Sequence, residues 1–182
     1  MKKVFIIIIV IATALFFYTM RDSTPLEKTV VPTENESEVF RPDPSSATFN
    51  IDDEVVILSA GRNEKPITPG SKLMEETVLL EQFAYGDINS DDKEDTVLLL
   101  SRNGVGSGTF IYLAAYVSGP VTYKGSKAIF IGDRIIPQSI SINQGIVTIN
   151  YLDRKIEDSF NTAPSIPITK LFVFRNGEFQ ER

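Results

Sequence analysis

The chain has 182 residues, a hydrophobic content of 42% and a formal net charge of −6, which suit one globular domain of ordinary size. The acidic balance argues against a nucleic-acid partner, because phosphate binding needs clustered Lys and Arg. The sequence contains no Cys and no His, so disulfides, thiolate zinc sites and a Ser-His-Asp catalytic centre are excluded.

Residues 1–21 are predicted to form an N-terminal signal anchor, a single transmembrane helix. Residues 4–20 carry no charge and would extend about 25 Å as a helix, near the lower limit for crossing a bilayer. Lys2 and Lys3 precede this run and favour a cytoplasmic N-terminus. The sequence therefore predicts a single-pass protein of the cytoplasmic membrane whose C-terminal domain is extracytoplasmic.

Two other interpretations of the apolar run stay open. Ala12-Thr13-Ala14 has the small-x-small form of a signal-peptide cleavage site, although it lies inside the apolar run. A buried core helix is the third interpretation, because the run has no polar face. An anchor and a cleaved signal peptide both export the rest of the chain.

Residues 22–48 are predicted to be a disordered linker. They are rich in Pro, Ser, Thr and Glu, and their apolar residues follow no period. Such a segment cannot bury enough apolar surface to offset the entropy of ordering. We expect it to hold the domain away from the membrane.

Residues 49–182 are predicted to form an all-β domain, a mainly antiparallel sandwich or open barrel. Residues 96–100 and 109–117 are apolar on both faces, as in central strands, whereas residues 139–143 alternate as in a sheet with one wet face. Gln144-Gly145 and Asn176-Gly177 predict hairpin turns. Residues 71–83 are the one candidate helix, and their second half is equally typical of a strand.

An acidic loop between two strand-like segments provides the most specific chemical signal. Oxygen side chains occur at alternate positions, and the carbonyl of the seventh loop residue can join them, which suits the six to eight oxygen ligands of calcium. The predicted calcium ligands are Asp87, Asn89, Asp91, Lys93 through its carbonyl, and Asp95. A solvated acidic turn without a metal is the alternative, since Asp and Asn are turn formers.

This loop resembles the calcium loops of FG-GAP and related integrin-type repeats, whose pattern is GDxNxDGxxD followed by an apolar strand. Gly86 and the four side-chain positions match, and residues 96–100 supply the strand. Asp92 replaces the usual Gly, at a position that favours positive φ. The resemblance implies a structural calcium ion. It is not an EF-hand, because Leu98 stands where a bidentate Glu is required.

Other short segments, at 106–110, 130–135 and 151–154, make the domain similar to short membrane-anchored bacterial domains, a likeness that implies no particular activity. The glycine-dense residues 104–108 predict a hairpin loop, because they lack the ending of a phosphate-binding loop. The couples Asp133-Arg134 and Asp153-Arg154 are expected to form salt bridges. No catalytic residue is predicted.

Three functions remain after these exclusions, and the last of them is a subunit of a larger envelope complex, which would show a large exposed apolar patch. The leading hypothesis is a membrane-anchored extracytoplasmic binding domain for a protein or a glycan, stabilised by calcium. The alternative is a carboxylate-based hydrolase of cell-envelope polysaccharide, which requires two facing carboxylates. Asp133, Asp153 and Asp158 are the candidates for such a pair.

Overall fold

The computed structural model describes residues 40–104, 106, 108–159 and 161–182. The predicted anchor and residues 22–39 of the predicted linker lie outside this part of the chain. Within it, no helix has the length and apolar character needed to cross a membrane. The strands are β1 (Thr48–Ile51), β2 (Glu54–Ile57), β3 (Arg62–Pro66), β4 (Met74–Gly86), β5 (Asp95–Asn103), β6 (Thr109–Val117), β7 (Lys124–Gly125), β8 (Ile129–Asp133), β9 (Ile136–Asn143), β10 (Ile146–Asp153), β11 (Ile166–Arg175) and β12 (Glu178–Glu181).

The strands form three sheets, and each pair of neighbouring strands is antiparallel. The largest sheet has the order β3-β4-β5-β6-β7, with β8 also paired to β6, and a second sheet has the order β12-β11-β10-β9. β1 and β2 form a two-stranded ribbon. The prediction of an all-β, mainly antiparallel domain is therefore confirmed.

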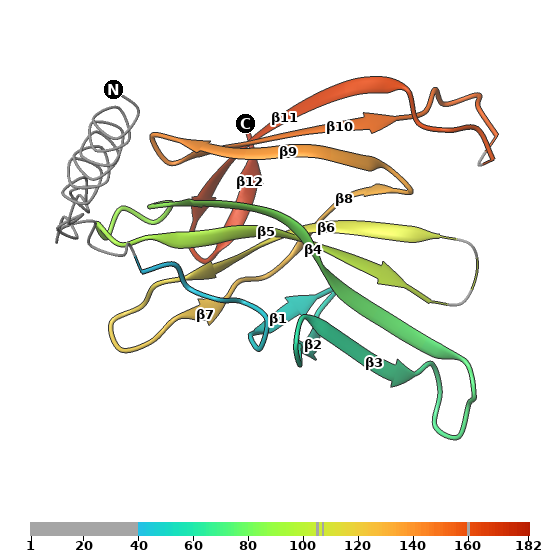
Figure 1. Cartoon of the computed structure of the whole chain (residues 1–182), viewed down its shortest axis with the longest axis horizontal. Helices are drawn as coiled ribbons and strands as arrows, with labels where there is room; N and C mark the ends of the chain where they lie inside the picture. The colour runs from blue at the N-terminus through green and yellow to red at the C-terminus, as the bar shows by residue number, and fades with distance from the viewer. Residues whose placement is uncertain (1–39, 105, 107, 160) are drawn as a thin grey trace, which may run out of the picture. The chain divides into compact units, whose positions relative to one another are not determined.

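The two central strands of the large sheet are buried on both faces. From Asp95 to Ser101 every residue of β5 is buried, because one face packs on the four-stranded sheet and the other on the β1–β2 ribbon. Figure 1 shows these layers on opposite sides of β5 and β6. On one face Leu99 and Leu113 join Val147 and Phe172, and this arrangement explains the continuous apolar runs read from the sequence.

Both predicted hairpins are present. Gln144 and Gly145 have φ of +50° and +73° between β9 and β10, and Asn176 and Gly177 have φ of +54° and +85° between β11 and β12. Two successive residues with positive φ are the type I′ turn, whose twist matches that of the flanking strands.

Residues 74–83 of the candidate helix at 71–83 belong to strand β4 instead. Residues 74–78 of β4 pair with β3, and β4 also pairs with β5 along most of its length, with a register shift between Leu79 and Phe83. Leu73 and Met74, which a helix with an apolar face would bury, are exposed. Hydrogen bonding to β3 on one side and β5 on the other outweighs the local helix signals of this segment.

The packed unit begins at Phe40, upstream of the expected boundary at residue 49. Pro42 and Pro44 are buried, and the Thr96 hydroxyl donates a hydrogen bond to the Pro42 carbonyl at 2.6 Å. The Arg41 guanidinium lies 4.7 Å from the centre of the Tyr85 ring. Residues 40–48 are thus fastened to the large sheet by specific contacts.

Candidate functional site

The acidic loop connects the end of β4 to the start of β5, as predicted. The Asp87 carboxylate accepts hydrogen bonds from the backbone N–H groups of Ser90 at 2.6 Å and Asp92 at 2.9 Å. Asn89 Oδ1 accepts one from the N–H of Asp91 at 3.1 Å. These bonds curl the loop so that the oxygens of Asp87 and Asn89 lie on its inner side.

Asp92 has the backbone conformation that the pattern of the calcium loops implies for its position. Its φ is +61°, in the left-handed region where Gly is the usual residue. The short polar side chain of Asp tolerates this region better than most side chains do. The departure from Gly at this position therefore leaves the course of the loop intact.

The buried Asp95 carboxylate joins the acidic loop to the segment after β6. It is fully buried and accepts hydrogen bonds from the N–H groups of Ile88 at 3.0 Å and Ser118 at 2.8 Å. Desolvation by burial raises the pKa of Asp95. The Ser118 hydroxyl donates a further hydrogen bond to Asp91. The Asn89 amide also donates to the Ser118 carbonyl at 3.2 Å, so three of the predicted ligands hold the chain at Ser118.

Lys93 takes part in the same connection. Its N–H donates to Asp91 at 3.1 Å, and its ammonium group donates to the Gly119 carbonyl at 3.4 Å. Across the described ranges, no group of three or more Asp, Glu, His or Cys side chains is arranged to hold a metal ion. An ionised carboxylate has about four acceptor positions. Asp91 accepts two hydrogen bonds and keeps lone pairs for a cation, whereas Asp87 accepts four, from the N–H groups of residues 89 to 92.

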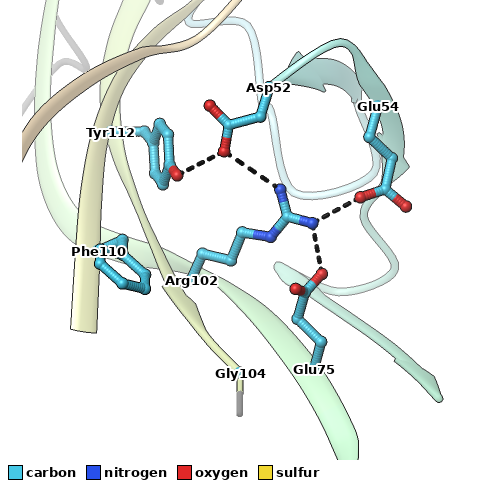
Figure 2. Close-up of a pocket in the computed structure, with 7 residues that line it drawn as sticks. All are labelled: Asp52, Glu54, Glu75, Arg102, Gly104, Phe110 and Tyr112. Carbon is cyan, nitrogen blue, oxygen red and sulfur yellow. Dashed lines mark hydrogen bonds and ion pairs between the residues drawn. The ribbon is translucent and has the colours of Figure 1, made fainter. Parts of the chain in front are cut away.

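A pocket at the other end of the large sheet was not predicted from the sequence. It has a volume of about 540 Å³ and is lined from the β1–β2 ribbon, β4, β5 and β6. Figure 2 shows its lining residues, which are Asp52, Glu54, Glu75, Arg102, Gly104, Phe110 and Tyr112. Its size is in the range of small-molecule sites.

Arg102 organises the polar side of the pocket. Its guanidinium donates hydrogen bonds to Glu54 and Glu75, both at 2.5 Å, and lies 3.6 Å from Asp52 Oδ2. Asp52 also accepts a hydrogen bond from the Tyr112 hydroxyl at 2.7 Å. Asp52 and the next residue have φ of +51° and +64°, so the hairpin turn of the ribbon places this carboxylate against Arg102 (Figure 2).

The ion pairs of the pocket keep Glu54 and Arg102 in their charged forms. The hydrogen bond from Lys65, together with that from Arg102, lowers the pKa of Glu54. Burial acts to lower the pKa of Arg102, but the bonds to Glu75 and Glu54 outweigh it and raise that pKa. Burial and the bond to Asp52 raise the pKa of Tyr112. At neutral pH the pocket therefore holds ionised Glu54 and Arg102 beside a protonated phenol.

An aromatic wall adjoins the polar side. The Phe110 ring lies 6.2 Å from that of Phe130, and the Tyr112 ring lies 5.8 Å from that of Phe130. Phe110 and Phe130 are 39% and 54% exposed. A Cβ atom at Gly108 would lie 2.7 Å from the Phe110 ring, so Gly leaves room for that ring. The site thus combines fixed charges with exposed aromatic surface.

The three acids considered for a hydrolytic pair do not meet in the pocket. Asp133, at the end of β8, accepts hydrogen bonds from the Arg134 guanidinium and from the Thr109 N–H at 3.0 Å. Asp153 accepts one from the N–H of the next residue at 2.7 Å. Asp158 accepts one from the N–H of Lys155 at 3.1 Å. Each of these carboxylates is thus engaged by residues outside the pocket.

The two Asp-Arg couples lie close to each other, although β8 and β10 do not pair. Asp133 forms an ion pair with Arg134. Arg154 donates a hydrogen bond to the Arg134 carbonyl at 2.9 Å and another to the Thr162 carbonyl. The contact between the couples therefore runs through a backbone carbonyl.

Sequence signals for the pocket existed but were weak. Arg102 is the one basic side chain of β5 and follows its apolar run, and Asp52-Asp53-Glu54 is a short acidic run. Glu75 and Arg102 lie on the consecutive strands β4 and β5, but nothing in the sequence indicates that the acidic turn at residues 52–54 packs against them. Asp95 and Arg102 stand near opposite ends of β5, about 20 Å apart at about 3.3 Å per residue. The acidic loop and the pocket are thus separate sites.

No family model, curated protein or solved structure matches this chain. The function is therefore argued from the chemistry of the two sites.

Proposed function

We propose that this protein is a membrane-anchored, extracytoplasmic binding domain whose recognition site is the pocket around Arg102. The observation that supports this role is a pocket of about 540 Å³ that combines a fixed network of charges with exposed aromatic rings. Pockets of this kind orient a ligand through a few placed polar groups and bind it through apolar surface. The partner is a protein or a glycan outside the cytoplasm.

The competing hypothesis is a hydrolase that uses two carboxyl groups. Such an enzyme needs one carboxyl held protonated beside an ionised one. The bond from Lys65 lowers the pKa of Glu54, and the adjacent Arg134 lowers the pKa of Asp133, so both carboxyls are kept ionised. Neither of these two carboxyls is therefore suited to the role of general acid.

A pulldown from solubilised cell envelope tests the binding role. Full-length protein in detergent is immobilised and compared with a pocket variant, Glu75→Gln with Phe110→Ala. The control variant is Glu76→Gln with Phe40→Ala, which removes the same chemical groups outside the pocket. We expect an envelope component that the pocket variant loses and the control retains.

Equal retention by both variants, or no retained component, would contradict the proposal. Glu76 is a suitable control because it adjoins Glu75 on β4 but pairs with Arg62 at 2.9 Å. Phe40 is 68% exposed and contacts the Tyr123 ring instead of the pocket.

We further propose that calcium binds the acidic loop and stabilises the domain. Support comes from the inward oxygens of Asp87 and Asn89 and from the left-handed backbone at Asp92. The Asp91 carboxylate and the Lys93 carbonyl are the additional ligands, and the buried Asp95 fixes the loop to Ser118. Because the ion would lie far from the pocket, its role is structural.

Melting curves test this metal site. We expect calcium to raise the melting temperature relative to chelator, and Asp87→Ala with Asp91→Ala to abolish the difference. Glu81→Ala with Glu157→Ala removes the same charge from two exposed positions outside the loop and should keep the response. Identical curves in calcium and chelator for the unmodified protein would defeat the calcium proposal and leave the pocket proposal standing.

A further inference from the structure

The charges of the pocket are compensated within the protein. Arg102 contacts all three pocket carboxylates, and Lys65 forms ion pairs with Glu54 and with Glu75 at 3.2 Å. Each carboxylate therefore already has a cationic partner. A charged ligand would have to displace one of these partners, whereas an uncharged ligand leaves the network intact.

Hydrogen-bonding capacity remains on the pocket side of this network. Within the described part of the chain, Asp52 Oδ1 and Glu75 Oε2 accept no hydrogen bond, while the second oxygen of each carboxylate is engaged. Arg102 has five N–H donors and hydrogen-bonds Glu54 and Glu75 through one of its nitrogens. The pocket thus presents fixed acceptors and donors to one ligand, a combination that hydroxyl groups satisfy because each both donates and accepts.

The aromatic wall supplies the apolar half of the recognition. Phe110 and Phe130 come from paired strands, β6 and β8, and both rings remain exposed beside the pocket. A flat ligand with an apolar C–H face would cover these rings and remove their surface from water. Hydroxyl groups around the edge of the same ligand would face Asp52, Glu75 and Arg102.

We infer that the pocket binds an uncharged saccharide, with a sugar ring packed on Phe110 and Phe130 and its hydroxyls bonded to the Arg102 network. A pyranose has both required features, a C–H face and a rim of hydroxyl groups. This inference rests on the proposed binding function and names the ligand class of the same site. A cationic peptide is the rival ligand, because the carboxylates outnumber the bases around Arg102.

Binding of defined probes to the full-length protein in detergent tests the inference. One arm is an array of uncharged oligosaccharides of glucose, mannose, galactose and N-acetylglucosamine. The other arm is tetralysine. We expect the protein to bind at least one oligosaccharide family, and the affinity measured by calorimetry to fall about tenfold in Phe110→Ala. Phe40→Ala, which removes an exposed ring elsewhere, should bind as the unmodified protein does.

A second pair of variants tests the polar half. Glu75→Gln should weaken saccharide binding, since it disturbs both the free acceptor and the bond to Arg102, whereas Glu76→Gln should not. Circular dichroism and melting curves establish that each variant is folded, and Phe130→Ala provides a second aromatic test if Phe110→Ala unfolds.

Three results would overturn the inference. They are absence of binding to every oligosaccharide, saccharide binding that is unaffected in all the pocket variants, and tetralysine binding in place of saccharide. If any of them occurs while the envelope pulldown still depends on the pocket, the ligand class is wrong and the binding function stands. If the pulldown also shows no dependence on the pocket, the function itself is wrong.

Discussion

At the scale of single residues, Asp95 illustrates how one buried carboxylate connects two loops. Both of its oxygens accept backbone N–H groups, one from Ile88 before it and one from Ser118 after β6. Sequence reasoning selected Asp95 for its oxygen atoms. Its full burial and its partner Ser118 could not be predicted, because they depend on how β6 ends beside β5.

Asp95→Asn should therefore lower the free energy of unfolding by about 1–3 kcal/mol, since the new NH₂ group faces a backbone N–H that has lost its acceptor. Urea denaturation measures the change. Asp92→Asn, an exposed neighbour whose positive φ suits Asn, should differ from the unmodified protein by about 0.5 kcal/mol or less. An equal loss in both variants would contradict this role of Asp95.

Glu54 makes a pH-dependent contribution to the stability of the fold, and its direction follows from the pKa of this residue. Its bonds to Lys65 and then Arg102 lower its pKa in the folded state below the unfolded value of about 4.3. Its contribution to stability is thus present above that value and lost as the pH falls through the folded pKa. The pKa of Asp133 is lowered by Arg134 and acts in the same direction, whereas the raised pKa of Asp95 opposes them.

We expect the free energy of unfolding to decrease as the pH falls below about 4.5. Glu54→Gln should make that decrease shallower, because Gln does not titrate. Chemical denaturation at a series of pH values provides the measurement, with Glu157→Gln as the control for loss of an exposed charge. A slope unchanged in Glu54→Gln would show that the Lys65 and Arg102 contacts do not stabilise the ionised carboxylate.

At the scale of elements, β5 is the strand on which both cores depend. Leu98 faces the ribbon, Leu99 faces the four-stranded sheet, and both are fully buried. Any strand of a two-layer sandwich would bury one of these two neighbours and expose the other, whereas β5 is covered by a layer on each face. The continuous apolar run at residues 96–100 was therefore a reliable signal of central position.

Leu98→Ala and Leu99→Ala should each destabilise the protein by about 2–5 kcal/mol, because each leaves a cavity in a different core. Val55→Ala on the ribbon, where Val55 is 65% exposed, should change stability by about 1 kcal/mol or less. Urea denaturation of the three variants measures these changes in the free energy of unfolding. A small effect at Leu98 would mean that the ribbon core contributes little.

The hairpin turns could be predicted from local sequence, whereas the strand conformation of β4 could not. Gly adopts positive φ readily whatever surrounds it, and so to a lesser degree does Asn, so both hairpins could be read directly from the chain. Residues 71–83 combine a plausible N-cap at Ser71 with residues that suit either helix or strand. Their structure was decided by hydrogen bonding to β3 and β5, which lies outside the segment itself.

At the scale of the whole molecule, the proposed role depends on the domain lying outside the cytoplasm. A reporter fused to the C-terminus tests this topology. We expect alkaline phosphatase, which requires export, to be active in the fusion, because the charges of Lys2 and Lys3 keep the N-terminus inside. A reporter active only in the cytosol would contradict the topology and, with it, an envelope partner.

The sequence by itself determined the β class, the central strands, two hairpin turns and the position of the acidic loop, because periodicity and turn chemistry are local properties of the chain. Only the tertiary structure decided that residues 40–48 pack on the sheet, that 74–83 extend as a strand, and that Asp95 holds Ser118. It alone revealed the pocket, since Asp52, in the turn of the ribbon, meets Glu75 of β4 and Arg102 of β5 only when the ribbon docks on the large sheet.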